Sequence, residues 1–189
     1  MKTHLQKLVG FLSLNAAVAA LCLFTQMGVS PARAAEESRG QLSSSDYKFA
    51  VDAFHANAAE ISLGQLAAQK ASSPAVQQFA QRMVQDHTKA NQQLEQIISQ
   101  KGASLPSTTT TSEGKEATHL EKLSGADFDK AYMDHMVKDH KKDVKEFQKA
   151  SNNVKDPDLK AFAANTLPIL QEHLQMAENT DATVKGTKP

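Results

Sequence analysis

The sequence predicts an all-α protein, a four-helix bundle in which two helical hairpins are joined by a long crossover. Three observations predict this fold. Apolar residues recur at three- and four-residue steps in four long segments, and helix-starting signals precede these segments. The first and second segments, like the third and fourth, are only a few residues apart, as in antiparallel helix pairs, whereas a polar stretch separates the two pairs.

The first 34 residues have the pattern of a secretory signal peptide. Lys2 and Lys7 form a positive start, an apolar stretch follows, and Ala32-Arg33-Ala34 matches a small-x-small cleavage site. We therefore expect export and cleavage before Ala35, which also removes Cys22. A membrane anchor is the alternative interpretation of the apolar stretch, but polar residues interrupt it.

The composition of the chain that remains after cleavage excludes several classes of function. The residues after residue 34 contain no cysteine, so they offer no disulfide, thiol ligand or thiol nucleophile, and their number suits one domain. They carry 18 basic and 21 acidic residues, and this slightly negative balance favours no nucleic acid. An exported chain without cysteines indicates the bacterial envelope, either the periplasm or an association with the outer membrane.

The first predicted hairpin follows a flexible leader over residues 35–45. Its first helix is predicted to begin at Asp46, which can cap it, and to end near Ala71. Ser73-Pro74 is a cap followed by a proline at the first helical position, so the second helix begins there. Gly102 suits the C-terminal end of that helix.

The crossover covers residues 102–123, and residues 113–123 are expected to form a short exposed helix that carries His119. A helix of about 28 residues is about 42 Å long, and 22 extended residues can span about 70 Å. The crossover can therefore run the length of the bundle, as in ferritin-like folds, and the second and third helices are then parallel.

The second predicted hairpin begins where Ser124 and Asp127 resemble a capping box. Asp156-Pro157 repeats the cap-and-proline start for the fourth helix. Pro168 lies inside that helix and should kink it, because proline removes a backbone hydrogen bond. The four-helix bundle is predicted over residues 46–178, followed by a flexible tail over residues 179–189.

A pentapeptide pattern occurs twice, as Met83-Val84-Gln85-Asp86-His87 and Met136-Val137-Lys138-Asp139-His140. We interpret the repeat as a duplicated helical hairpin. In each copy the histidine follows methionine by four residues and valine by three, so it shares their apolar helix face. Burying an imidazole costs free energy unless a group hydrogen-bonds or coordinates it.

Motifs spread over residues 46–178 resemble those of a family of bacterial envelope proteins, the domain of unknown function 4142, often labelled outer membrane proteins. The resemblance implies a ferritin-like fold, but no biochemical activity. Besides the two pentapeptides, it is carried by Ala59-Glu60-Ile61-Ser62-Leu63-Gly64-Gln65-Leu66-Ala67, Phe128-Asp129-Lys130-Ala131-Tyr132-Met133 and Leu167-Pro168-Ile169-Leu170-Gln171-Glu172-His173-Leu174.

One polar residue on the apolar stripe of each helix gives the candidate metal site: Glu60, His87, His140 and His173. Three imidazoles and a carboxylate suit one divalent ion, zinc, iron or manganese, with copper less favoured. Asp86 and Asp139 are expected to accept the second ring N–H of histidines on neighbouring helices. The number of residues between a ligand and its hairpin turn gives the ligand's position along the bundle axis. By this count, Glu60 and His87 lie at the same level, whereas His173 lies about one helical turn from His140.

Other interpretations remain open. In a metal-free bundle, Glu60 would pair with histidines, and Asn91 or Thr166 would complete a buried hydrogen-bond network. Thioethers suit Cu(I), and methionines lie near the three histidines (Met83, Met136 and Met176), although methionine also fills apolar cores. His55 and His135 are expected at the surface.

The sequence gives little support for an enzyme. It lacks the paired Glu-x-x-His motifs of di-iron sites, and no nucleophile or acid–base pair stands beside the candidate ligands. Two functions are left: a metal-binding bundle for envelope metal handling or stress protection, and a metal-free structural or interaction bundle of the envelope.

Overall fold

A computed structural model of the chain describes residue 36, residues 38–106 and residues 111–186. The expected signal peptide, its cleavage site and Cys22 lie outside these residues. Five helices follow one another in the described part of the chain: α2 (Ser44–Lys70), α3 (Pro74–Gln100), α4 (Thr111–Glu121), α5 (Gly125–Asn153) and α6 (Pro157–Lys185). None of them is both long and apolar enough to cross a membrane.

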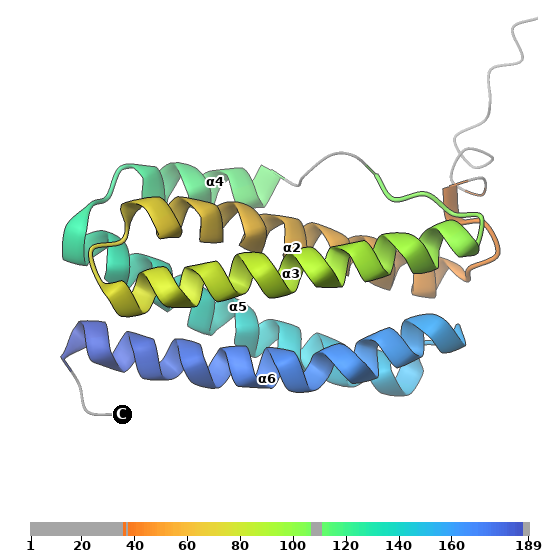
Figure 1. The fold of residues 1–189 in the computed structure, drawn as a ribbon. Coiled ribbons are helices and arrows are strands. Elements are labelled where there is room, and N and C mark those ends of the chain that lie inside the picture. Colours follow the sequence, from red (N-terminus) through yellow and green to blue (C-terminus); the bar gives the residue numbers. More distant parts are fainter. Residues whose placement is uncertain (1–35, 37, 107–110, 187–189) are drawn as a thin grey trace, which may run out of the picture.

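The four long helices form a bundle of two hairpins, α2 with α3 and α5 with α6 (Figure 1). The hairpin turns lie at opposite ends of the bundle, so α3 and α5 run in the same direction. The predicted all-α bundle, two hairpins joined by a long crossover, is confirmed in the described residues.

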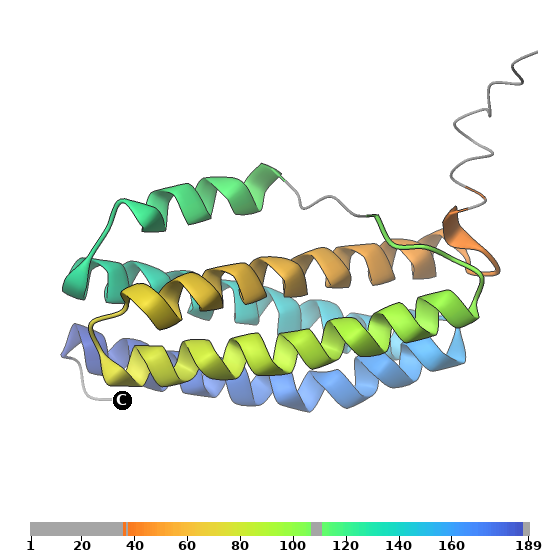
Figure 2. The same ribbon diagram turned by 45° about the horizontal axis from the view of Figure 1, so that its top comes forward.

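The second half of the crossover is helical, as expected, and forms α4. This helix lies beside α2 and also contacts α5 (Figure 2). His119 is exposed, whereas Leu120 is fully buried and anchors the helix in the core. The Nζ of Lys70 donates to the carbonyl oxygen of Glu121 at 2.5 Å, which ties the last turn of α4 to the end of α2.

The start of the first helix differs from the prediction. Ser43, rather than Asp46, is the N-cap, and its hydroxyl accepts the backbone N–H of Asp46 at 3.1 Å. Leu42, within the predicted flexible leader, is buried. The sequence offers several capping residues in a row, and the burial of Leu42 favours Ser43, which directly follows it.

The end of the last helix also differs. α6 continues through Pro168 to Lys185, seven residues beyond the predicted end at Glu178, and Gly186 then adopts a positive φ of 69°. Val184 packs on the apolar core and Lys185 pairs with Asp181 at 2.8 Å. These contacts outweigh the polar character of the segment, so residues 179–185 belong to the bundle rather than to a flexible tail.

The core consists of two apolar clusters along the bundle axis. One surrounds the α5–α6 turn and includes Leu94, Ile98, Phe147, Leu159, Phe162 and Leu170. The other surrounds the α2–α3 turn and includes Val76, Phe79, Met83, Phe128, Tyr132 and Met136. Each long helix passes from one cluster to the other at a polar residue, so a buried polar layer separates the two clusters.

The repeated pentapeptide lies in α3 and α5. These are the second helix of one hairpin and the first helix of the other, whereas a duplicated hairpin would place the copies in α3 and α6. The interpretation of the repeat as a duplicated hairpin is therefore wrong. The repeat instead marks two parallel helices whose histidines reach the same buried layer.

Candidate metal centre

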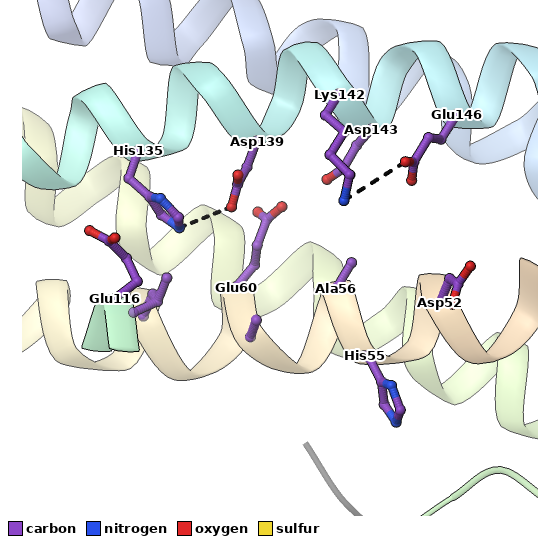
Figure 3. A pocket seen from close by; sticks show the side chains of 12 residues that line it. Asp52, His55, Ala56, Glu60, Glu116, His135, Asp139, Lys142, Asp143 and Glu146 are labelled. Carbon is purple, nitrogen blue, oxygen red and sulfur yellow. Dashed lines mark ion pairs between the residues drawn. The ribbon is translucent and has the colours of Figure 1, made fainter. Parts of the chain in front are cut away.

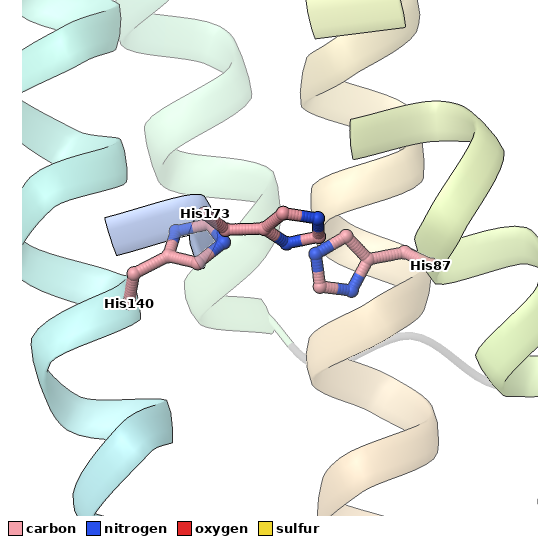
Figure 4. Close-up of side chains that lie close together, drawn as sticks. All are labelled: His87, His140 and His173. Atoms are coloured by element: carbon pink, nitrogen blue, oxygen red, sulfur yellow. The ribbon is translucent and has the colours of Figure 1, made fainter. Parts of the chain in front are cut away.

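The polar layer brings together one residue from each long helix. Glu60 on α2, His87 on α3, His140 on α5 and His173 on α6 are each at most 3% exposed. Figure 4 shows the three imidazoles pointing toward one another from three helices. Their ring centroids are 5.4–5.8 Å apart. The centre thus contains all four residues that their spacing on the helices singles out.

Each imidazole uses one ring nitrogen to bind a group outside the centre. The Nδ1–H of His87 donates to Asn57 Oδ1 at 2.8 Å, and the Nδ1–H of His140 donates to the carbonyl oxygen of Met136 at 2.9 Å. The Nε2–H of His173 donates to Asp86 Oδ2 at 3.0 Å. In the neutral form of each ring, these hydrogen bonds fix the tautomer and leave a lone pair on the second nitrogen.

Those second nitrogens are buried and have no hydrogen-bond partner among the described residues. They are Nε2 of His87, Nε2 of His140 and Nδ1 of His173. A buried acceptor without a partner costs free energy, so three of them in one layer require an explanation.

Glu60 completes the centre. Its Oε2 lies 2.9 Å from His87 Nε2 and 3.4 Å from His140 Nε2, yet the angles make no hydrogen bond, and both carboxylate oxygens lack a hydrogen-bond partner in the described part of the chain. Ligands about 2.0–2.1 Å from one ion and about 90–110° apart lie about 2.9–3.4 Å from each other. The separations around Glu60 Oε2 therefore fit ligands of one cation, and they also fit a carboxylate beside a protonated imidazole.

The ligand nitrogens of the three histidines lie further from one another than ligands of a single ion do. One ligand nitrogen from each lies within 4.8 Å of one from each of the others. Three atoms so arranged have a central point no more than about 2.8 Å from each, and shifts of under about 1 Å then give zinc–nitrogen bonds of about 2.0–2.1 Å. Small side-chain movements are therefore enough to bring the three histidines around one ion. Glu60 is not part of this group of three and contacts His87 and His140.

Burial and charge set the protonation of these groups. Burial alone would raise the pKa of Glu60, but the positive charges of His87 and His140 outweigh it and lower that pKa. Burial would lower the pKa of His87, whereas the charge of Glu60 raises it. Burial lowers the pKa of His173 to about 4, although Asp86 opposes this shift, so its imidazole is neutral near pH 7. The ionised carboxylate of Glu60 and the neutral ring of His173 are the forms that bind metals, whereas the raised pKa of His87 favours a protonated ring, whose proton a metal ion would have to displace.

Two further residues belong to the layer, and our interpretation of the sequence missed both. Asn57 links His87 to Asn91, whose Oδ1 accepts the Asn57 amide at 2.8 Å. Asp143 faces Glu60, and burial together with the charge of Glu60 raises the pKa of Asp143 to about 9. A signal for each was present, because Asn57 precedes Glu60 by three residues and Asp143 follows His140 by three.

The two aspartates of the repeated pentapeptide have different partners. Asp86 receives the ring N–H of His173 from the neighbouring helix. Asp139 does not contact the centre's histidines in this way and instead pairs with His135 on its own helix at 2.9 Å. The prediction that Asp139 accepts a ring N–H from a histidine on a neighbouring helix is therefore wrong. His55 and His135, expected at the surface, are both half-buried.

Comparison with known proteins identifies the family but no closely similar protein. No curated protein and no solved structure matches this chain. Residues 31–180 match the family described as Domain of unknown function (DUF4142), in agreement with the resemblance carried by the sequence motifs. Because this match covers most of its length, the chain belongs to the DUF4142 family.

Proposed function

We propose that this protein binds a single divalent metal ion in the core of its bundle, through Glu60, His87, His140 and His173, and that it serves metal handling or stress protection in the bacterial envelope. One observation carries the proposal. The Nε2 atoms of His87 and His140 lie 2.9 and 3.4 Å from the same carboxylate oxygen of Glu60, in a layer where all these side chains are at most 3% exposed. Neutral imidazoles and a carboxylate repel at these distances unless a metal ion or a proton lies between them.

The surroundings of the ligands support the same proposal. Each histidine is held by a second group (Asn57, the Met136 carbonyl or Asp86), which is the arrangement typical of metal-bound imidazoles. Three imidazoles and one carboxylate favour zinc, iron or manganese. Copper is less favoured, because Met83 and Met136 belong to the apolar cluster beside the layer.

A metal-free network is the second candidate, and one observation favours it. His87, Asn57, Asn91 and the carbonyl oxygen of Phe54 form a continuous chain of hydrogen bonds. With a proton on His87, the Glu60–His87 contact becomes a buried ion pair, and the layer then fixes the register of the helices. Protons and metal ions compete for the same atoms, so the two states can be separated by measurement.

Metal content and thermal stability test the proposal directly. Untagged protein purified from the periplasm without chelator is expected to contain about one equivalent of a single metal by elemental mass spectrometry. The folded state alone has the site, so a metal at about 100 times its Kd should add about 2.7 kcal/mol to the free energy of unfolding. His87→Ala and His140→Ala should lose both the metal and this stabilisation.

His119→Ala is the matched control, because His119 is exposed on α4 and is not one of the buried residues of the layer. It should retain the metal content and melting temperature of the wild type. A metal-free wild type whose melting temperature ignores added zinc, iron, manganese and copper would contradict metal binding and favour the hydrogen-bond network. Fractionation of cells that produce the full chain tests the envelope location.

A further inference from the structure

A pocket with a strongly acidic lining opens between α2 and α5, and α4 borders one end of it. Its volume is about 430 Å³. Two basic side chains that line it are paired with carboxylates: the Nζ of Lys142 lies 3.8 Å from Glu146, and Nε2 of His135 lies 2.9 Å from Asp139. The carboxyl groups that line the pocket come from three helices: Asp52 and Glu60 on α2, Glu116 on α4, and Asp139, Asp143 and Glu146 on α5.

The inner wall of this pocket is part of the metal centre. Figure 3 shows Glu60 projecting from α2 toward α5, with Asp139 and Asp143 opposite it. Glu60 is 3% exposed, and neither of its oxygens has a hydrogen-bond partner in the described residues. The same carboxylate therefore faces the pocket and contacts His87 and His140.

A second pocket reaches the centre from the opposite side, between α3 and α6. It is smaller, about 110 Å³, and His87 and His173 line it. Lys89 lines it as well, and Arg82 lies beside it, each paired with Asp86. Two positive side chains around one carboxylate oppose the approach of a cation to this pocket.

We propose that the acidic pocket between α2 and α5 is the route by which a hydrated divalent cation reaches the centre, and that Glu60 transfers the ion from the pocket to the histidines. The inference rests on the proposed function. Carboxylates outnumber the cationic side chains that line this pocket, and a cleft with an excess of one sign of charge raises the association rates of oppositely charged ligands. Carboxylate oxygens bind divalent cations that keep part of their water shell, whereas imidazoles suit zinc, iron and copper.

A narrowed pocket tests the route. Ala56 lines the pocket on α2, one turn before Glu60, and carries neither charge nor a candidate ligand atom. In Ala56→Phe, the association and dissociation rates of Co²⁺, followed by stopped-flow absorbance, should both fall at least about tenfold. The Kd should stay within about threefold of the wild type, because a blocked route slows both directions equally.

Ile169→Phe is the matched control, because Ile169 lines the second pocket and is 40% exposed. It should leave both rates within about twofold of the wild type. Ala59→Met, also in the acidic pocket, repeats the test with a flexible side chain if Ala56→Phe does not fold. Slower binding in Ile169→Phe with unchanged rates in Ala56→Phe or Ala59→Met would overturn the proposed route.

The charges are tested separately. Asp52→Asn combined with Glu146→Gln should slow Co²⁺ association several-fold at low ionic strength. Salt should reduce this difference, since the Debye length falls from about 30 Å at 0.01 M to about 3 Å at 1 M. Glu95→Gln, which removes an exposed charge on α3 away from the acidic pocket, should have little effect.

The equilibrium measurement separates the route from the function itself. Normal Co²⁺ stoichiometry and affinity with unchanged rates in every pocket variant would overturn the route and leave the proposed function intact. A wild-type protein that binds no Co²⁺, zinc, iron or manganese at equilibrium would overturn the proposed function and the route together.

Discussion

At the scale of single residues, Asp86 and Asp139 occupy the same position in the repeated pentapeptide but have different surroundings. Asp86 receives the ring N–H of His173, whereas Asp139 pairs with His135 four residues earlier on its own helix. Each aspartate points about 100° around the helix from the histidine that follows it. Its partner therefore depends on which helix lies in that direction, and only Asp86 faces α6.

This difference predicts unequal effects of the same substitution. Asp86→Ala should weaken metal binding about 10–100-fold, because the His173 imidazole loses the group that orients it. Asp139→Ala should leave the Kd within about threefold and the metal content unchanged. Competition titration with a chelator of known affinity measures both, and equal losses in the two variants would contradict the distinction.

At the scale of helices, the direction of side chains explains how His173 reaches the layer. Counted from the α5–α6 turn, His173 is about three residues further away than His140. Helical side chains lean toward the N-terminus of their own helix, so His140 leans away from the turn and His173 leans toward it. Because the two side chains lean in these directions, their imidazoles lie closer together along the bundle axis than their Cα atoms do.

The helix starts show how local signals can share a sequence pattern and differ in structure. Ser73-Pro74 and Asp156-Pro157 both begin helices, as predicted. The Asp156 carboxylate accepts the backbone N–H groups of Asp158 and Leu159 at 3.0 and 3.1 Å, whereas the Ser73 side chain makes no capping hydrogen bond. Burial raises the pKa of Asp156, but hydrogen bonds from Leu159 and Lys101 outweigh this and lower it.

Asp156→Ala should therefore lower the free energy of unfolding by about 1 kcal/mol at pH 7. The pKa of this carboxyl is lower in the folded than in the unfolded state, where it is about 3.9, so its contribution is complete above about pH 4. The contribution disappears as the pH falls through the folded-state pKa. Urea denaturation between pH 7 and pH 3 measures it, with Ser73→Ala as a control that should change stability little at any pH.

At the scale of the whole molecule, two buried aspartates fasten the hairpins to each other. Asp46 on α2 accepts the backbone N–H groups of Lys155 and Asp156 at 3.2 and 3.1 Å, in the turn of the other hairpin. Asp129 on α5 accepts those of Ser72 and Ser73 at 3.0 and 2.9 Å, in the turn between α2 and α3. Each end of the bundle is thus closed by a carboxylate from the opposite hairpin.

Asp129→Ala and Asp46→Ala should each cost about 1–3 kcal/mol of unfolding free energy, because each leaves backbone N–H groups without partners. The two sites lie at opposite ends of the bundle, so the double variant should show the sum of the single effects within about 0.5 kcal/mol. Glu95→Ala, at an exposed position on α3 outside both hairpin turns, is the control and should change stability by less than about 0.5 kcal/mol. Clear non-additivity in urea denaturation would contradict two independent fastenings.

The sequence by itself determined the helices and the residues on their apolar faces. Periodicity of three and four residues is a property of a single helix, so it correctly predicts the hairpins, the crossover helix and the inward direction of Glu60, His87, His140 and His173. Helix ends were less predictable: Ser43 replaces Asp46 as a cap, and α6 extends past Glu178 because Val184 finds an apolar surface.

Only the tertiary structure decided which groups meet across the helices. The pairing of Asp86 with His173, the place of Asn57 and Asp143 in the polar layer, and the acidic pocket beside Glu60 depend on how neighbouring helices are ordered, rotated and tilted. These contacts join residues far apart in the chain, and no local period encodes their distances. The spacing within each helix therefore identified the candidate ligands, while packing between helices determined their partners and the proposed route to them.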